Sequence, residues 1–241
     1  MLSGWRRGSH SADGFEFPTY TEGEGPGVIV MHESPGLTPE VVRFGREVVD
    51  AGFTVVLPHF FGPAHRAPYA LEAVHVIPRL CIGREFTTVA TGRTTPVAAW
   101  LRSLARRVHG EAGGLGVGAV GMCFTGGFAL AMMVDTSVVA PVVCQPSVPF
   151  AVSPGRSRDL NLSPADLKTV KERAAGGCAV LGLRYEGDAA VGKRFDTLTK
   201  ELGDAFIKVE FPGRKHSTVT EHRQQEGVDK VLAFFGERLR A

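Results

Sequence analysis

The run AVGMCFTGGFAL at residues 119–130 decides the fold of this chain. It has the pattern of a buried strand that breaks on small residues and continues as a helix, with Cys123 at the break. A strand-to-helix turn of this kind strains the backbone of its central residue and exposes that side chain at the edge of a sheet. Gly121 leaves room for the turn, although Thr125 stands where a second glycine is usual. The pattern predicts that Cys123 is a nucleophile, and the competing interpretation is a buried structural thiol.

The composition is typical of a globular protein and argues against several classes of function. Of the 241 residues, 44% are hydrophobic and 22% are charged, and the formal net charge is +2. We therefore expect a single domain over residues 1–241, with its core at about 28–239. Neither a nucleic-acid partner nor a membrane partner is expected from this charge balance. Residues 1–14 lack the apolar stretch of an export signal, and no later segment is long and apolar enough to span a membrane.

The cysteines and glycines indicate neither a metal site nor a cofactor site. The four cysteines have no C-x-x-C or metal-ligand spacing, and a chain of this size needs no disulfides, so we expect a cytoplasmic protein without bound metal. No G-x-G-x-x-G run follows the first expected strand and no phosphate-loop lysine is present, so no cofactor is expected. The oligomeric state has no signal in the sequence.

Strand-like and helix-like segments alternate along the chain. Strands are expected at residues 28–31, 54–57, 115–120, 138–144, 178–183 and 205–209. Helices are expected between and after them, at residues 40–49, 96–108, 124–134, 164–173, 192–202 and 219–239. This alternation predicts the α/β class, with a mostly parallel, doubly wound sheet and helices on both faces.

In such a sheet the ligand lies beyond the carboxyl ends of the strands, where three chemically useful side chains follow in order. Cys123, Asp188 and His216 come after the expected strands 115–120, 178–183 and 205–209. A thiol is a strong nucleophile only as thiolate, so it needs an imidazole, and the imidazole needs a carboxylate to fix its orientation. The order nucleophile, acid, base therefore predicts a catalytic triad. The competing interpretation of His216 is a solvated loop histidine.

Four motifs together resemble the dienelactone hydrolase family, whose members are cysteine hydrolases of the α/β-hydrolase fold. They are GMCFTGG at 121–127, Gly187-Asp188, KHS at 215–217 and HESPGL at 32–37. The likeness covers the chain from about Val28 to its C-terminus. It implies the triad Cys123, Asp188 and His216. It also implies that Glu33 takes up the thiol proton when substrate binds, whereas the alternative for Glu33 is a carboxylate that caps the following turn.

An acyl-transfer site also needs two backbone N–H donors for the developing oxyanion. Phe124, which follows the nucleophile, is expected to supply one of them. The other is expected from Ser34, because Pro35 has no N–H. Aromatic and histidine side chains of the irregular region 58–86 could line a pocket or belong to a solvated covering loop, and none is given a role: His59, Phe60, Phe61, His65 and Tyr69.

The substrate is the least determined feature. Family members hold a substrate carboxylate with arginines, one of them four residues after the catalytic histidine, and here that position is Thr220. Other arginines that could replace it are Arg84, Arg93, Arg214 and Arg223. We therefore expect hydrolysis of a small ester or lactone. Two alternatives remain: a non-catalytic or redox-sensing binding protein on the same scaffold, and a cysteine peptidase or acyltransferase with the same triad.

Overall fold

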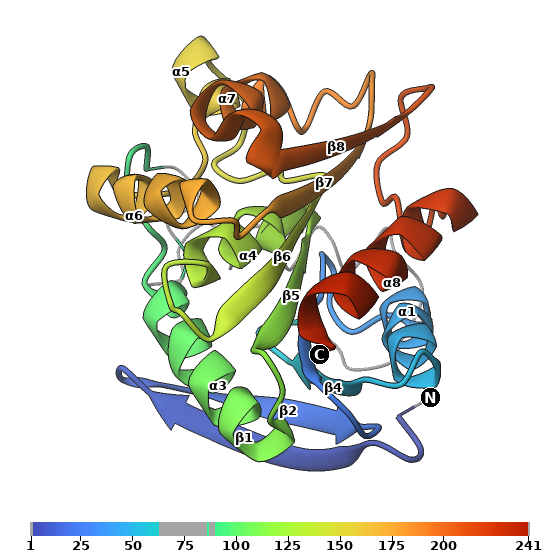
Figure 1. The fold of residues 1–241 in the computed structure, drawn as a ribbon. Coiled ribbons are helices and arrows are strands. Elements are labelled where there is room, and N and C mark those ends of the chain that lie inside the picture. The colour runs from blue at the N-terminus through green and yellow to red at the C-terminus, as the bar shows by residue number, and fades with distance from the viewer. Residues whose placement is uncertain (1, 63–85, 87–89, 241) are drawn as a thin grey trace.

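The computed structural model describes residues 2–62, 86 and 90–240, and its centre is an eight-stranded sheet of order β1-β2-β4-β3-β5-β6-β7-β8 (Figure 1). β1 pairs antiparallel with β2 and β2 pairs antiparallel with β4, whereas every pair from β4 to β8 is parallel. This confirms the predicted α/β class. The strands are β1(Arg6–Ala12), β2(Phe15–Glu22), β3(Gly27–Met31), β4(Thr54–Pro58), β5(Val117–Met122), β6(Val138–Cys144), β7(Val180–Tyr185) and β8(Phe206–Phe211).

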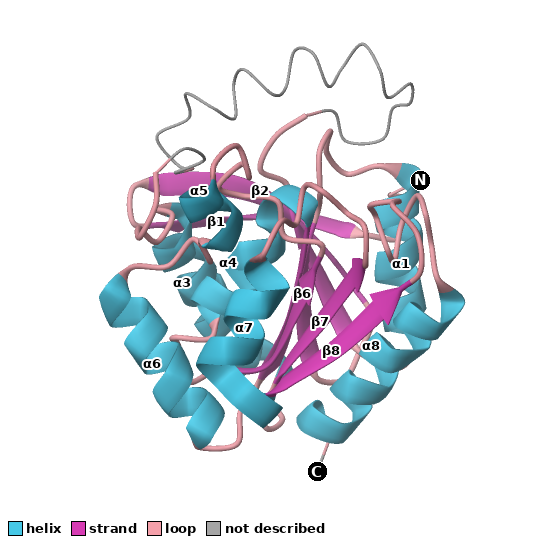
Figure 2. Cartoon of the chain, turned by 90° about the horizontal axis from the view of Figure 1, so that it is seen from above, coloured by secondary structure: helices cyan, strands magenta, loops and turns pink. Residues whose placement is uncertain are grey.

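Helices cover both faces of the sheet, as Figure 2 shows from above. One face is covered by α1 and α8, and the other by α3, α4, α6 and α7. Thr38 caps the first of these helices, since its hydroxyl accepts the N–H of Val41, and Pro39 fills the first helical position. The helices are α1(Pro39–Asp50), α3(Val97–Ala112), α4(Gly126–Met132), α5(Pro154–Arg158), α6(Pro164–Ala175), α7(Arg194–Leu202) and α8(Gln225–Leu239), with single turns at η1(Cys123–Thr125) and η2(Gly203–Ala205).

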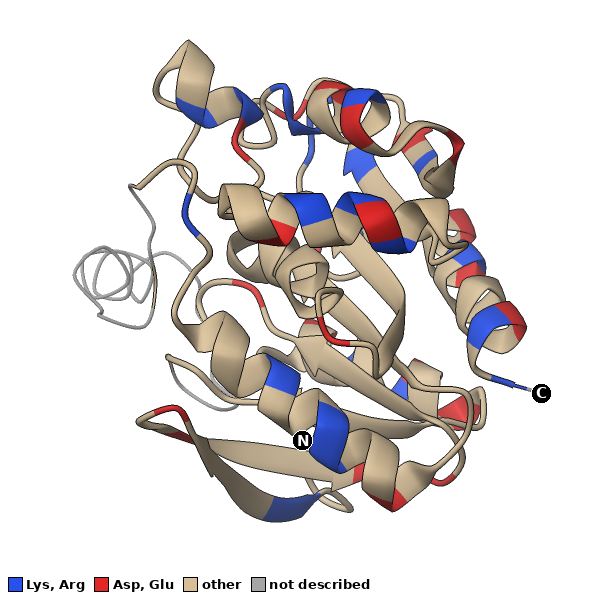
Figure 3. Cartoon of the chain, turned by 60° about the vertical axis from the view of Figure 1, so that its left-hand side comes forward, with Lys and Arg blue, Asp and Glu red and all other residues tan. Residues whose placement is uncertain are grey.

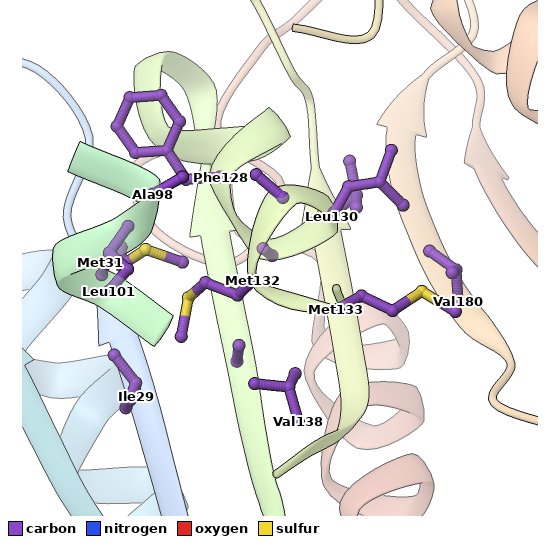
Figure 4. Close-up of a cluster of buried hydrophobic side chains, with 14 of the residues drawn as sticks. Ile29, Met31, Ala98, Leu101, Phe128, Leu130, Met132, Met133, Val138 and Val180 are labelled. Atoms are coloured by element: carbon purple, nitrogen blue, oxygen red, sulfur yellow. The ribbon is translucent and has the colours of Figure 1, made fainter. Parts of the chain in front are cut away.

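The apolar core lies in two layers, one on each side of the sheet. Figure 4 shows the layer in which helix α4 packs on the sheet and beside helix α3. Phe128 and Met132 of α4, and Met133 directly after it, are almost fully buried there. Because helix α4 is buried along its whole length, it holds the turn that precedes it, and Cys123 with it, in a fixed position.

Charged residues are concentrated in the outer helices and the β1–β2 hairpin, while the middle of the sheet has almost none (Figure 3). The strands β3, β5 and β6 are buried nearly throughout, which agrees with a parallel sheet covered on both faces. Within the described residues, no helix combines the length and the apolar character that crossing a membrane requires.

The structure corrects the sequence-based element assignment in three places. The hairpin of β1 and β2 precedes the expected core and was not predicted. Helix α8 begins at Gln225, six residues after the predicted start at Val219, because the side chains of Thr218 and Thr220 bind buried polar groups. A short helix, α5, lies in a segment predicted as loop.

Candidate active site

The nucleophile candidate stands on a strained turn, as its sequence predicts. Strand β5 ends at Met122, and Cys123 follows with φ of 52°, a left-handed backbone conformation that residues other than glycine rarely adopt. A Cβ on Gly121 would lie 2.1 Å from the carbonyl oxygen of Thr125, so only glycine fits two residues before Cys123. The thiol of Cys123 is partly buried and forms no disulfide.

Thr125, which departs from the usual glycine pattern, fastens the turn. Its hydroxyl accepts the N–H of Met122 at 3.0 Å and lies 3.1 Å from the carbonyl oxygen of Met31 in β3. The crowded position has moved to Gly126, where a Cβ would lie 2.6 Å from the Cα of Pro146. The departure from the pattern therefore leaves the turn intact and links β5 to the end of β3.

Asp188 and His216 lie side by side beyond β7 and β8. The Nδ1 atom of His216 is 2.6 Å from Oδ2 of Asp188. The Asp188 side chain is 5% exposed and that of His216 is 27% exposed. Burial alone would lower the pKa of His216, but the hydrogen bonds and charges of Asp188 and Cys123 raise it to about 11. The structure thus brings Cys123, Asp188 and His216 together, and the imidazole is stabilised in its protonated form.

Glu33 is buried directly after β3, where it is surrounded by hydrogen-bond donors. The hydroxyl of Ser217 donates to Oε2 at 2.9 Å, the hydroxyl of Thr220 donates to Oε1, and Nε2 of Gln145 is 3.5 Å from Oε2. Burial raises the pKa of Glu33, while the hydrogen bonds and nearby His216 act in the opposite direction. Within the described part of the chain, no hydrogen bond joins Glu33 to Cys123.

Gln145 connects the carboxyl group of Glu33 to the loop that carries His216. The sequence did not predict this role. Its Oε1 accepts hydrogen bonds from the hydroxyl of Thr218 at 2.7 Å and from the backbone N–H of the same residue at 3.3 Å. Its Nε2 faces Glu33. Gln145 therefore links the ends of β3 and β6 to the loop that carries His216.

Arg194 is a second connection that the sequence did not reveal. The side chain is 1% exposed although it is charged, and burial lowers its pKa to about 10. Its guanidinium donates to six main-chain carbonyl oxygens, which belong to Pro146, Pro149, Arg156, Asp159, Ala190 and Val191. These carbonyls lie on the loop after β6, in and directly after helix α5, and on the segment that follows Asp188. The helical periodicity of the sequence places Arg194 on a helix but gives no signal for this long-range role.

The predicted oxyanion donors lie in the expected loops. Phe124 follows Cys123 in the η1 turn, and Ser34 lies in the loop after β3, beyond Glu33. The Ser34 amide makes no hydrogen bond within residues 2–62, 86 and 90–240, so it is free to donate to a ligand.

Aromatic rings pack beside the nucleophile turn. The ring of Phe124 meets the rings of Phe61 and Phe86 edge to face, with centroids 5.3 and 5.1 Å away. His32 holds the backbone next to these rings, since its Nε2 accepts the N–H of Phe60 at 3.0 Å. Burial lowers the pKa of His32 to about 3, so its ring is neutral. His59 bonds to the Gly62 carbonyl at 2.9 Å, whereas His65, Tyr69, Cys81 and Arg84 lie outside the described residues.

The described arginines that were considered as partners of a substrate carboxylate differ in their surroundings. Arg93 and Arg214 are exposed, and Arg223 pairs with Glu47 at 2.7 Å. Thr220, in the position where family members carry arginine, uses its hydroxyl to bind Glu33. In the described ranges, no three histidine, cysteine or acidic side chains come together as a metal site requires.

Comparisons with known proteins agree with this geometry. The sequence model of the Dienelactone hydrolase family matches residues 16–233. The fold is similar to that of a dienelactone hydrolase from Anabaena variabilis, with 16% identity, coverage of 98% of each chain and a TM-score of 0.64. A cold-adapted esterase from an Arctic intertidal metagenomic library has 17% identity over 98% of this chain and 94% of its own, with a TM-score of 0.64.

A further solved structure, the dienelactone hydrolase-like promiscuous phosphotriesterase P91 from metagenomic libraries, has 14% identity, coverage of 98% of each chain and a TM-score of 0.67. A comparison of the sequence with curated proteins gives no match. At these identities the solved structures establish the α/β-hydrolase fold, and the family model covers most of the chain. The protein therefore belongs to the dienelactone hydrolase family and is a carboxylic ester hydrolase.

Proposed function

We propose that this protein hydrolyses small esters or lactones through a covalent intermediate on Cys123. The observation that carries the proposal is the arrangement of Cys123, His216 and Asp188 after three strands of one sheet, with Cys123 and Asp188 both raising the pKa of His216. A nucleophile, an imidazole and an orienting carboxylate in contact are the parts that acyl transfer needs. The strained backbone of Cys123 supports the same role.

In the acylation half, the thiolate of Cys123 attacks the acyl carbon, and the carbonyl π electrons move to oxygen. The backbone N–H groups of Phe124 and Ser34 stabilise the resulting oxyanion. The intermediate then collapses, the acyl C–O bond breaks and the alkoxide takes a proton from the His216 imidazolium. A thioester on Cys123 and a neutral His216 remain.

In the deacylation half, His216 takes a proton from water, which attacks the thioester. The thiolate leaves as the C–S bond breaks, and the acid product is released. The sulfur of a thioester carries no charge, so its contribution to the raised pKa of His216 disappears in the acyl-enzyme. The imidazole is then a stronger candidate for a base than it is while the thiolate lies beside it.

For Glu33 we propose the role that the family resemblance implies, namely acceptor of the thiol proton when substrate binds. A carboxylate has about four acceptor positions, and the three donors around Glu33 leave one for the thiol proton. Burial of the group, which raises its pKa, also favours proton uptake. The proton returns to the sulfur when the thiolate leaves in deacylation, so the cycle balances.

The nucleophile is tested by sustained turnover of 4-nitrophenyl acetate and of a panel of lactones, short esters and thioesters. Cys123→Ala is expected to abolish turnover in a folded protein, because the covalent route is lost. The matched control is Cys178→Ala, which removes another partly buried free thiol, two residues before β7, and should turn over like the wild type. Full activity of folded Cys123→Ala would refute the proposal.

The role of Glu33 is tested by alkylation of Cys123 with iodoacetamide, followed by mass spectrometry so that each cysteine is scored separately. A carboxylate that competes with His216 keeps the resting thiol protonated, so Glu33→Gln should speed alkylation near neutral pH. A wild-type thiolate that is already formed at pH 6 and is unchanged in Glu33→Gln would favour a simple thiolate–imidazolium pair instead.

A further inference from the structure

Ser147 contacts the candidate nucleophile twice, although no sequence motif points to it. It lies in the loop after β6, and it is 6% exposed. Its backbone N–H donates to the carbonyl oxygen of Cys123 at 3.0 Å. Its Oγ is 3.4 Å from the Sγ of Cys123, and in the part of the chain that the structure describes this is the hydroxyl's one hydrogen bond.

The hydroxyl of Ser147 therefore depends on the sulfur for its hydrogen bonding. A buried hydroxyl without a partner is unfavourable, so its proton has to point toward the sulfur whenever the sulfur can accept it. A thiolate accepts a hydrogen bond far better than a thiol does, because hydrogen bonds to charged groups are roughly twice as strong as neutral ones. The contact consequently favours the charged form of Cys123.

The loop that carries Ser147 is held firmly enough to keep this geometry. Pro146 packs against Gly126, at the start of the helix that follows the nucleophile turn. Arg194 donates to the carbonyl oxygens of Pro146 and Pro149, on either side of Ser147. Ser147 is thus fixed relative to Cys123 from both ends of the loop, and the hydroxyl is oriented before any substrate arrives.

We propose that Ser147 is a positioning residue that holds the sulfur of Cys123 and stabilises its thiolate, both before attack and when the thiolate leaves the acyl-enzyme. This inference rests on the proposed role of Cys123. It differs from the effect proposed for Glu33 in the resting site, since Ser147 favours the thiolate there and the carboxylate opposes it.

The test is the rate of Cys123 alkylation by iodoacetamide as a function of pH, scored by mass spectrometry. Ser147→Ala is expected to move the midpoint of this profile up by about one pH unit, so that alkylation below the midpoint is about tenfold slower. Ser147→Thr keeps a hydroxyl and should stay within about twofold of the wild type. The matched control is Ser103→Ala. Ser103 lies on α3, and its hydroxyl is hydrogen-bonded to His10 of β1, where the helix packs on the hairpin.

A residue that only supports the loop would lower activity without moving the pH midpoint, so a Ser147→Ala profile that coincides with the wild type would overturn the inference. Ser147→Gly removes the same hydroxyl and gives the same readout if the alanine variant does not fold. The result is separable from the proposed function, because loss of turnover in Cys123→Ala decides the nucleophile while the alkylation profile decides Ser147.

Discussion

The tightest requirement of the nucleophile turn is the absence of a side chain at Gly121, which makes Gly121→Ala an informative change. The added Cβ would lie 2.1 Å from the Thr125 carbonyl oxygen and 3.0 Å from that of Gly126. Real Cβ atoms stay at least 3.0 Å from such neighbours, so the backbone would have to move by about 0.9 Å, the difference between 3.0 and 2.1 Å. The neighbours are main-chain atoms of a buried turn and cannot swing aside.

We expect Gly121→Ala to lower the free energy of unfolding by about 3 kcal/mol, at the upper end of what overpacking costs. A displacement of about 1 Å at the nucleophile should also lower kcat/KM by about a hundredfold. Urea unfolding followed by circular dichroism measures the first effect, and ester turnover measures the second. Gly236→Ala is the matched control, because its Cβ meets open space on helix α8 and should stabilise the protein by about 0.5–1 kcal/mol.

A Gly121→Ala protein with wild-type stability would refute the steric argument, whatever its activity. A destabilised variant that keeps wild-type kcat/KM would instead show that the turn tolerates a shift without moving the reacting sulfur. The two measurements therefore separate the packing of the turn from its use in catalysis.

Three further predictions concern the residues around the site. Asp188→Asn should lower the free energy of unfolding most below pH 6.5 and progressively less toward pH 11. The reason is that the raised pKa of His216 contributes stability that is lost as the imidazolium loses its proton. A pH-independent difference in urea unfolding would contradict this. Arg194→Lys should cost about 3 kcal/mol, since an ammonium cannot reach six carbonyls, whereas Arg238→Lys should cost little, because Arg238 is partly exposed and donates to the carbonyl of Gly177 alone among the described residues; equal losses in urea unfolding would count against the role of Arg194. Turnover of the triple variant Cys123→Ala, His216→Ala, Asp188→Asn should scarcely fall below that of the worst single variant, and additive losses would indicate separate roles.

Local patterns in the sequence were sufficient for the parallel part of the fold, because fully buried strands such as β3 and β6 are short runs of apolar residues. The β1–β2 hairpin was not predicted, because β1 is largely exposed and carries arginine, serine and histidine. Its sequence therefore lacks the apolar–polar alternation of a half-buried strand. The start of helix α8 was predicted too early because Val219 continues the helical spacing, while the neighbouring threonines bind Gln145 and Glu33 instead.

The candidate triad could be read from the sequence because each member follows a strand and has a chemically distinctive side chain. Ser147, Gln145 and Arg194 could not, since their importance lies in contacts between segments far apart in the chain. Serine, glutamine and arginine are common residue types, and nothing in their local spacing separates these three from ordinary loop and helix residues. In the sequence, Thr220 is notable only because it stands where family members carry an arginine. Its hydrogen bond to Glu33 is visible only in the structure.

The cross-links made by Arg194 and Gln145 join the loops that carry Ser147, Asp188 and His216. Opening one loop breaks hydrogen bonds to its neighbours, so we expect these segments to open together. Partly assembled states, in which the sulfur is exposed without its base, are accordingly rare. The sulfur is therefore presented to solvent mainly together with the groups that favour its thiolate, which is the form that attacks an acyl carbon. The same hydrogen bonds that order the site thus keep the nucleophile and its base available at the same moment.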